Sequence, residues 1–398
     1  MSDQTIGSLP AAIYVHIPFC VRKCPYCDFT SYSGREHLFS PYVQALGSEI
    51  HRMAARFPDA VISTIYFGGG TPNILPCELL HNVLAAIRAC FTVTTDAEIT
   101  IEANPGLHDR QGGSNAQCLG ESGFTRLSLG FQSLNNVELK LLGRIHTKED
   151  AVLAFHEARD AGFENINVDL MYGIPGQTLD SWCETLDATI ALAPEHVSLY
   201  SLSVEEGTPF WDMYQAGSLQ PPSTDAEADM YVMAVEKLKN HGFLHYEISN
   251  FARPNFQCRH NITYWKNEPY FGFGAGATSC LEGTAIHRPE CLYVRATNVR
   301  DVEEYIRRSQ AEEHLAEIED CADRKTAMGE TMFLGLRMLE GVDTHGFRQR
   351  YGAPIQSVFG PEISELMRRE LLEETDRHIR LTSRGLLLAN EVFIKFVG

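Results

Sequence analysis

Short apolar runs alternate with amphipathic stretches along residues 13–241. The apolar runs are rich in β-branched residues and predict strands at 13–17, 61–67, 98–103, 126–131, 165–171 and 196–202. The stretches between them have helical periodicity and predict helices at 40–57, 77–90, 115–122, 178–192 and 226–241, with two more between 134 and 161. Strand–helix units in series imply an α/β fold with parallel strands and right-handed crossovers. Such a chain forms a barrel or an open doubly wound sheet, with its functional groups at the carboxyl ends of the strands.

The pattern changes after residue 242. Residues 243–291 are irregular and rich in glycine and aromatic residues, which favours strands and loops that close or cover one edge of the sheet. Helical periodicity returns at 302–308 and 324–339. From residue 341 onward, short helices, a β-turn element around 377–385 and a terminal helix at 386–396 resemble a winged-helix module. The sequence therefore predicts three domains: 1–242, 243–310 and a smaller, mainly helical domain of 311–398.

Charge and cysteine content narrow the choice of partners. The 398-residue chain has a formal net charge of −19, which argues against nucleic-acid binding because phosphate contacts need clustered lysine and arginine. Its eleven cysteines are scattered and odd in number, so we expect free thiols in a reducing compartment. Residues 1–10 show no signal-peptide pattern, and no apolar run reaches the ~20 residues that span a bilayer. We expect a cytoplasmic protein, with peripheral membrane contact and a homodimer left open.

The first predicted strand leads into a loop with three cysteines, Cys20, Cys24 and Cys27. Thiolates suit iron–sulfur clusters, zinc and copper(I). Three of them can hold three irons of a 4Fe–4S cluster, with the fourth iron open to a substrate or cofactor, because Asp28 and Phe29 follow in place of a fourth cysteine. A zinc site and unconnected buried thiols are the alternatives.

Other strand ends also carry glycine or polar residues. The second strand ends in Gly68–Gly69–Gly70–Thr71, whose backbone N–H groups would be exposed to a ligand; a tight turn is the alternative. Glu102, at the end of the third strand, can accept hydrogen bonds from ribose hydroxyls, or it can simply be solvated. Four further candidates are Tyr14, Gln132, Arg144 and Asp169. Asp169 lies in an apolar strand, where a buried carboxylate needs a partner. As the alternative to a ligand, Arg144 could be that partner in an ion pair.

A second group of candidates lies in the segment C-R-H-N-I-T-Y-W, residues 258–265. His260 or Cys258 can ligate heme iron, and the rings of Tyr264 and Trp265 can stack on a porphyrin. The alternative for His260 is a hydrogen-bonded histidine with no ligand.

At these residues the sequence resembles the radical S-adenosylmethionine (SAM) superfamily. The resemblance is to the branch that contains oxygen-independent coproporphyrinogen III oxidase and a group of heme chaperones, and it is carried by Tyr14, His16, Pro18, Tyr26, Asp28 and Phe29. The last two residues and the H-N-x-x-Y-W pattern are similar to the chaperones. The resemblance covers residues 12–277 with specific motifs and extends more weakly to the C-terminus. It implies a partial (β/α)6 TIM-like barrel, a 4Fe–4S cluster, SAM and heme.

The resemblance also implies roles for individual residues. Gly69, Gly70 and Thr71 would contact the methionyl part of SAM, and Glu102 would bind SAM as well. Gln132, Arg144 and Asp169 would help to bind SAM, including a second copy in some relatives. Tyr14 and Tyr26 would lie on the cofactor side, and the glycine-rich run 271–277 would pack against the adenine.

Two departures separate this chain from the oxidase. The oxidase has a further cysteine where Phe29 stands here, and it has a long N-terminal extension, whereas 13 residues precede Tyr14. Both features favour a heme chaperone that hands heme to an acceptor protein. The alternative is a radical SAM enzyme that decarboxylates porphyrinogen propionates or alkylates another substrate. The sequence does not decide whether SAM is cleaved.

Overall fold

The structure is a computed structural model that describes residues 9–106 and 115–397. The first eight residues, on which part of the leader prediction rests, lie outside it. None of the helices in the described residues is long and apolar enough to cross a membrane.

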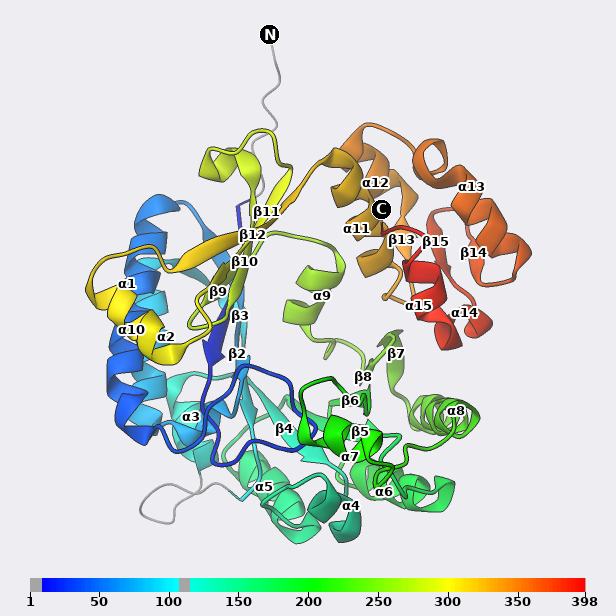
Figure 1. Cartoon of the computed structure of the whole chain (residues 1–398), viewed down its shortest axis with the longest axis horizontal. Coiled ribbons are helices and arrows are strands. Elements are labelled where there is room, and N and C mark those ends of the chain that lie inside the picture. The colour runs from blue at the N-terminus through cyan, green and yellow to red at the C-terminus, as the bar shows by residue number, and fades with distance from the viewer. Residues whose placement is uncertain (1–8, 107–114, 398) are drawn as a thin grey trace.

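One large sheet forms the body of the molecule (Figure 1). Its strand order is β7-β8-β6-β5-β4-β3-β2-β1-β9. The strands are β1 (Ala12–Ile17), β2 (Val61–Gly69), β3 (Thr92–Ala103), β4 (Arg126–Gln132), β5 (Ile166–Tyr172), β6 (His196–Ser201), β7 (Leu244–Glu247), β8 (Asn250–Ala252) and β9 (Phe271–Phe273). Strands β1 to β6 are parallel and lie in chain order, β9 is parallel to β1, and β8 is antiparallel to β6. A doubly wound sheet reverses its strand order. This sheet does not, so it is the expected partial barrel.

Amphipathic helices cover the outer face of this sheet (Figure 1). They are α1 (Phe39–Arg56), α2 (Cys77–Cys90), α3 (Asn115–Ser122), α4 (Asn136–Leu141), α5 (Lys148–Asp160), α6 (Leu179–Ala191) and α8 (Thr224–Asn240). Most bounds agree with the sequence prediction within two residues. Within the barrel, the exceptions are β3 and α7 (Pro209–Gln215). β3 begins six residues early at Thr92 because its polar first half pairs with the start of β2, and the pattern did not predict the short helix α7.

A three-stranded antiparallel sheet follows the barrel. It consists of β10 (Thr278–Glu282), β11 (Tyr293–Asn298) and β12 (Ala316–Ala322), with α10 (Val302–Gln310) between the last two strands. The pairing of β12 with β11 joins residues 316–322 to the middle segment, beyond the boundary that the sequence predicts at 310. The division into three domains stays a prediction. The segment expected to be irregular also contains one α-helix, α9 (Arg259–Trp265).

The C-terminal segment has an apolar core of its own. It contains α11 (Arg324–Gly335), α12 (Thr344–Tyr351) and α13 (Ile355–Arg368), followed by the hairpin of β14 (Leu372–Glu374) and β15 (His378–Leu381), which pairs with β13 (Val342–Asp343). The single terminal helix expected at 386–396 is wrong. Two short helices, α14 (Ser383–Leu387) and α15 (Ala389–Phe393), replace it because Leu388 between them has φ −117° and ψ 28°.

The expectation that every thiol is free is also wrong. Two disulfides join Cys77 to Cys118 and Cys291 to Cys321. The partners are 41 and 30 residues apart in the sequence, and their Cα atoms lie 6.3 and 5.3 Å apart. Packing of α3 on α2 brings the first pair together and pairing of β12 with β11 the second, which no spacing in the sequence reveals.

Candidate cofactor site

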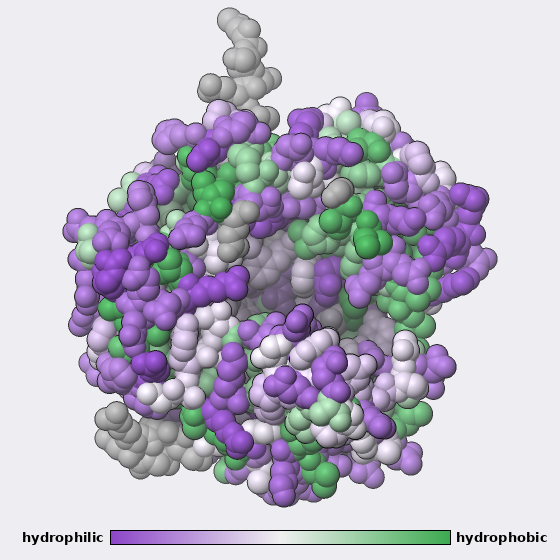
Figure 2. Space-filling view, viewed as in Figure 1, coloured by the Kyte–Doolittle hydropathy of each residue, from purple (hydrophilic) through white to green (hydrophobic). Residues whose placement is uncertain are grey.

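The carboxyl ends of the parallel strands surround a cavity of about 400 Å³. This volume falls in the range of cavities that bind small molecules. Figure 2 shows a hollow near the middle of one face of the molecule. Almost all the cofactor residues that the sequence indicated line the cavity: Cys20, Cys24, Tyr26, Cys27, Gly69, Gly70, Thr71, Glu102, Gln132, Arg144 and Asp169.

The cysteine loop is held by the backbone and by two polar side chains. The N–H of Cys20 donates to the carbonyl of Tyr32 at 2.9 Å, and the N–H of Cys27 donates to the carbonyl of Cys24 at 3.1 Å. Thr71 Oγ1 donates to Cys20 Sγ at 3.5 Å. Arg144 Nη1 donates to Cys24 Sγ at 3.7 Å. Burial raises the pKa of Cys20 and Cys27, and the Thr71 hydrogen bond acts in the opposite direction on Cys20.

The three thiols line one cavity but do not form a site for a single metal ion. Within residues 9–106 and 115–397, no three His, Cys, Asp or Glu side chains are arranged to hold one metal ion. The fit to an iron–sulfur cluster therefore rests on three partly buried thiols that line one cavity.

The glycines of the second strand end are required by close packing. A Cβ on Gly69 would lie 2.4 Å from the His16 ring, and a Cβ on Gly70 would lie 2.5 Å from the Phe19 carbonyl oxygen. Gly70 N–H donates to Ile17 O and Thr71 N–H to Phe19 O, at 2.9 and 2.7 Å. Gly69 N–H donates to Glu102 at 3.3 Å. The expectation that this loop exposes its N–H groups is therefore wrong, because the protein itself uses all three.

Two half-buried carboxylates, Glu102 on β3 and Asp169 on β5, line the cavity. Glu102 accepts a hydrogen bond from the Tyr66 hydroxyl at 2.8 Å. Burial, and then the charge of Asp169, raise the pKa of Glu102 to about 7. Burial also raises the pKa of Asp169. Two groups that repel each other in this way suit a ligand that brings hydroxyl donors or positive charge.

Asp169 has partners other than the one considered from the sequence. Its carboxylate accepts hydrogen bonds from Ser128 Oγ at 2.9 Å and from Asn167 Nδ2 at 2.8 Å. Arg144 instead donates to the Gly130 carbonyl at 2.9 Å and to Asn104 Oδ1. The Asp169–Arg144 ion pair is therefore not formed, and the Arg144 guanidinium is turned toward Cys24.

Gln132 ends β4 with a φ of 65°. This left-handed conformation is uncommon for a residue with a side chain and costs about 1–3 kcal/mol. Strain of this kind persists where the surroundings fix it, and clusters at functional sites. Here it accompanies a side chain that lines the cavity.

A second cavity, of about 370 Å³, adjoins the first and shares Phe29, Gly69 and Glu102 with it. Its other lining residues are Tyr14, His16, Thr30, Tyr264, Tyr270, Gly276, Ala277 and Thr278. Tyr14 is bonded through its hydroxyl to His16 Nδ1 at 3.0 Å. The structure thus places Tyr14 beside the cysteine cavity, together with part of the glycine-rich run 271–277.

The H-N-x-x-Y-W segment forms α9, and its residues are largely engaged by the protein. His260 is 1 % exposed, and its Nδ1 and Nε2 are hydrogen-bonded to Thr64 Oγ1 at 3.0 Å and to the Tyr264 hydroxyl at 2.8 Å. Burial lowers the pKa of His260 to about 3. Cys258 is fully buried, and burial raises the pKa of its thiol to about 12. The Arg337 guanidinium covers the Trp265 ring at 4.3 Å.

Sequence reasoning missed several residues of the site. Asn104 donates to Thr71 Oγ1 at 2.8 Å and accepts from Arg144, so it orients both residues that donate to the cysteines. Its position two residues after Glu102, at a strand end, was the available signal. Ser128 and Tyr200 also line the cavity, but they lie inside apolar strands and carry no such signal. Glu98 was also missed: its carboxylate accepts the N–H groups of Arg259 and His260, both at 3.0 Å, at the start of α9.

Family models and solved structures agree with this geometry. Residues 14–189 match the radical SAM superfamily, and residues 322–388 match the HemN C-terminal domain. The solved structure of coproporphyrinogen III oxidase (HemN) from Escherichia coli superimposes with a TM-score of 0.82 at 23% identity, and the match covers 98% of this chain and 90% of that one. At 23% identity, this structural similarity shows that the two chains share a fold, and no more than that. A partial barrel with three cysteines after its first strand and this C-terminal segment defines a protein of the radical SAM class.

Curated relatives narrow the class further. The heme chaperone HemW of Bacillus subtilis (strain 168) is 38% identical over 97% of this chain and 98% of its own length. HemW of Lactococcus lactis subsp. lactis (strain IL1403) is 37% identical over 98% and 97%. HemW of Escherichia coli (strain K12) is 32% identical over 98% of each chain. The chain belongs to the HemW family.

Proposed function

We propose that this protein is a heme chaperone that holds a 4Fe–4S cluster and SAM in its barrel and passes heme to an acceptor protein. The observation that carries the proposal is the single cavity lined by the three cysteines, the glycine loop and the two carboxylates. Full-length similarity to proteins named heme chaperone HemW supports the heme part. The formal net charge of −19 argues against a nucleic-acid partner.

Cys20, Cys24 and Cys27 are the proposed cluster ligands. Bound there, the cluster would supply an electron for SAM and leave one iron open to it. The protein contributes Thr71 and Arg144, whose donors lie 3.5 and 3.7 Å from two of the sulfurs. Hydrogen bonds and positive charge at thiolate sulfurs tune a cluster's potential.

SAM is proposed to lie between the glycine loop and the two carboxylates. Gly69, Gly70 and Thr71 line one part of the cavity, and Glu102 offers an acceptor for ribose hydroxyls. Gln132, Arg144 and Asp169 line the same cavity. Tyr26 lines the same cavity, and Tyr14 lies in the cavity next to it.

Heme is proposed to bind next to α9, with His260 as its axial ligand. His260 is preferred to Cys258 because its hydrogen-bond partner Tyr264 lines the second cavity, whereas the Cys258 thiol is directed at the Glu98 carboxylate, 3.6 Å away. Tyr264, which lines the second cavity, is the ring best placed to contact a porphyrin there. Trp265 is covered by Arg337, so its role is packing at the end of the helix.

A heme titration of the anaerobically reconstituted protein tests the proposal. We expect one heme per chain, with a Soret band that changes in His260→Ala, and transfer of the heme to an apo heme protein. In parallel, coproporphyrinogen III with SAM and a reductant should give no tetrapyrrole product. Conversion to protoporphyrinogen without specific heme binding would contradict the chaperone and support the oxidase.

A further inference from the structure

His260 is held in a state in which it cannot bind iron. Both ring nitrogens are hydrogen-bonded, one to Thr64 on β2 and the other to Tyr264 one turn along α9, and the ring is 1 % exposed. The Tyr66 ring stacks on the imidazole with the centroids 5.2 Å apart. A ligand can reach either nitrogen only after one hydroxyl has moved.

The hydroxyls of Thr64 and Tyr264 differ in which atom of the His260 ring they bind, an N–H or a lone pair. A neutral imidazole has one N–H and one lone pair, so it donates to one hydroxyl and accepts from the other. Metal-bound histidines donate the other ring N–H to a fixed protein acceptor. Thr64 lies on a central strand of the sheet and suits this role, which assigns the N–H to Nδ1 and the lone pair to Nε2, where Tyr264 now donates.

Tyr264 is the movable partner because one side of it faces empty space. Its ring lines the second cavity, which adjoins the cysteine cavity through Phe29, Gly69 and Glu102. In that cavity its edge contacts Tyr270, with ring centroids 4.6 Å apart. Rotation of Tyr264 away from His260 would open Nε2 toward this cavity, whereas Thr64 has no comparable freedom.

We propose that Tyr264 is a latch on His260: its hydroxyl occupies the Nε2 lone pair in the heme-free protein, and heme iron replaces it from the second cavity while Thr64 keeps the Nδ1–H. This inference rests on the proposed heme function. It assigns Tyr264 and Thr64 as positioning residues with opposite effects on heme affinity.

Tyr264→Phe tests the latch. The variant keeps the ring but leaves Nε2 buried without a partner in the heme-free state only, so heme should bind about three- to tenfold more tightly and associate faster. Tyr351→Phe is the matched control, because it removes another buried tyrosine hydroxyl, bonded to Thr331 at 2.7 Å and to the Ala327 carbonyl at 3.0 Å, and should leave heme affinity unchanged. Affinities come from heme titrations of the reconstituted full chain, read as difference spectra.

Thr64→Val should change heme affinity in the opposite direction. It tests the latch independently if Tyr264→Phe does not fold. Loss of the Nδ1–H acceptor should weaken heme binding about threefold or more. Unchanged or weaker heme binding in Tyr264→Phe, or unchanged heme binding in Thr64→Val, would overturn the latch. If His260→Ala still lost heme binding in that case, the proposed heme function would stand without the latch. Wild-type affinity in His260→Ala would overturn the ligand assignment and the latch together.

Discussion

At the scale of single residues, the cofactor cavity combines groups that would repel one another or stay protonated without a ligand. Glu102 and Asp169 are both half-buried, and their pKa values are both raised. Cys20 and Cys27 have raised thiol pKa values, although Thr71 donates to one of these sulfurs. Groups with perturbed pKa values cluster at functional sites. Here they indicate that a bound ligand would balance the charges of the cavity.

Removal of one cysteine should remove the cluster. Cys24→Ala deletes the sulfur that accepts from Arg144, and two thiolates do not retain a 4Fe–4S cluster. We expect iron and sulfide after anaerobic reconstitution to fall to near background. Cys183→Ala, a partly buried thiol on α6, is the control. Equal iron content in the Cys24 and Cys183 variants would remove Cys24 from the ligand set.

SAM affinity should depend on pH through Glu102. Its pKa is about 7, so the carboxylate is mostly ionised at pH 8 and mostly protonated at pH 6. Because ribose hydroxyls donate to the ionised form, lowering the pH from 8 to 6 should weaken SAM binding by up to about tenfold. Calorimetry on reconstituted protein measures this change. Glu102→Gln should bind SAM more weakly, with a much flatter profile, and an equally steep profile would exclude Glu102 as the cause.

At the scale of elements, α9 depends on groups that other elements supply. The helix has seven residues, and its N-cap, Cys258, provides no side-chain cap. The Glu98 carboxylate on β3 takes that role by accepting two backbone N–H groups. At the other end, Arg350 of α12 donates to the Lys266 carbonyl at 2.9 Å and to that of Asn267. A short helix that is marginal by itself is thus fixed from both sides.

Glu98→Gln should loosen α9. The amide retains an acceptor oxygen but loses the charge that favours a helix N-terminus, which should cost about 1–2 kcal/mol. We expect faster amide hydrogen exchange at 259–265, with little change in the parallel strands. Glu317→Gln, an exposed carboxylate on β12, is the matched control. Equal exchange at α9 in both variants would mean that Glu98 does not cap the helix.

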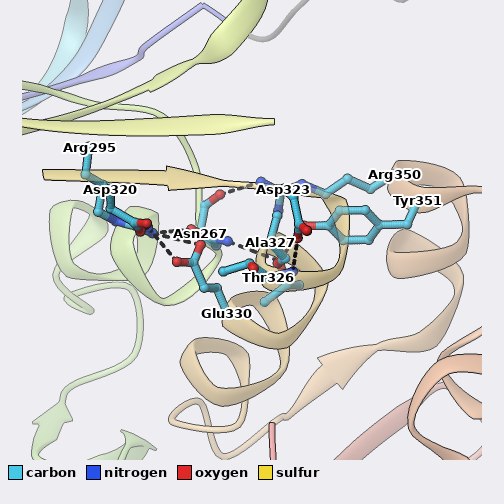
Figure 3. Close-up of polar contacts among 10 residues, drawn as sticks. Asn267, Arg295, Asp320, Asp323, Thr326, Ala327, Glu330, Arg350 and Tyr351 are labelled. Atoms are coloured by element: carbon cyan, nitrogen blue, oxygen red, sulfur yellow. Dashed lines mark hydrogen bonds and ion pairs between the residues drawn. The ribbon is translucent and has the colours of Figure 1, made fainter. Parts of the chain in front are cut away.

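At the scale of the whole molecule, a polar junction joins the C-terminal segment to the middle sheet (Figure 3). Arg295 of β11 makes a two-pronged ion pair with Glu330 of α11, at 2.5 and 3.0 Å. The same guanidinium donates to Asp320 at 3.1 Å and to Asn267 at 3.4 Å (Figure 3). Since Asn267 directly follows the turn that ends α9, the junction also connects the H-N-x-x-Y-W helix to the middle sheet.

Breaking this junction from one side should be costly. Arg295→Met leaves the Glu330 carboxylate, whose side chain is 11 % exposed, without its cation, and such losses reach about 3–5 kcal/mol. The thermal midpoint should fall, and proteolysis near residues 311–323 should become faster. The double variant Arg295→Met/Glu330→Met should recover most of the loss because no charge is left unpaired. A double variant as unstable as the single one would show that packing, not charge, holds the junction.

Much of the candidate site could be predicted because strand ends meet in a parallel barrel. Cys20, Gly69, Glu102 and Gln132 follow or end four successive strands, and they line one cavity although 112 residues separate the first from the last. Asn104 escaped prediction because its role is to bond Thr71 and Arg144, which depends on side-chain directions. Tyr200 escaped because an aromatic residue in an apolar strand is typical of a core.

The sequence by itself determined the strand–helix alternation, the cysteine loop and the glycine and acidic strand ends, because these are local patterns that backbone sterics and hydrophobic burial translate directly. Only the tertiary structure decided the partners of Asp169, the disulfides, the pairing of β12 and the engagement of His260 by Thr64 and Tyr264. These contacts join segments from different parts of the chain. Their existence depends on strand register and helix packing, which no short stretch of sequence encodes.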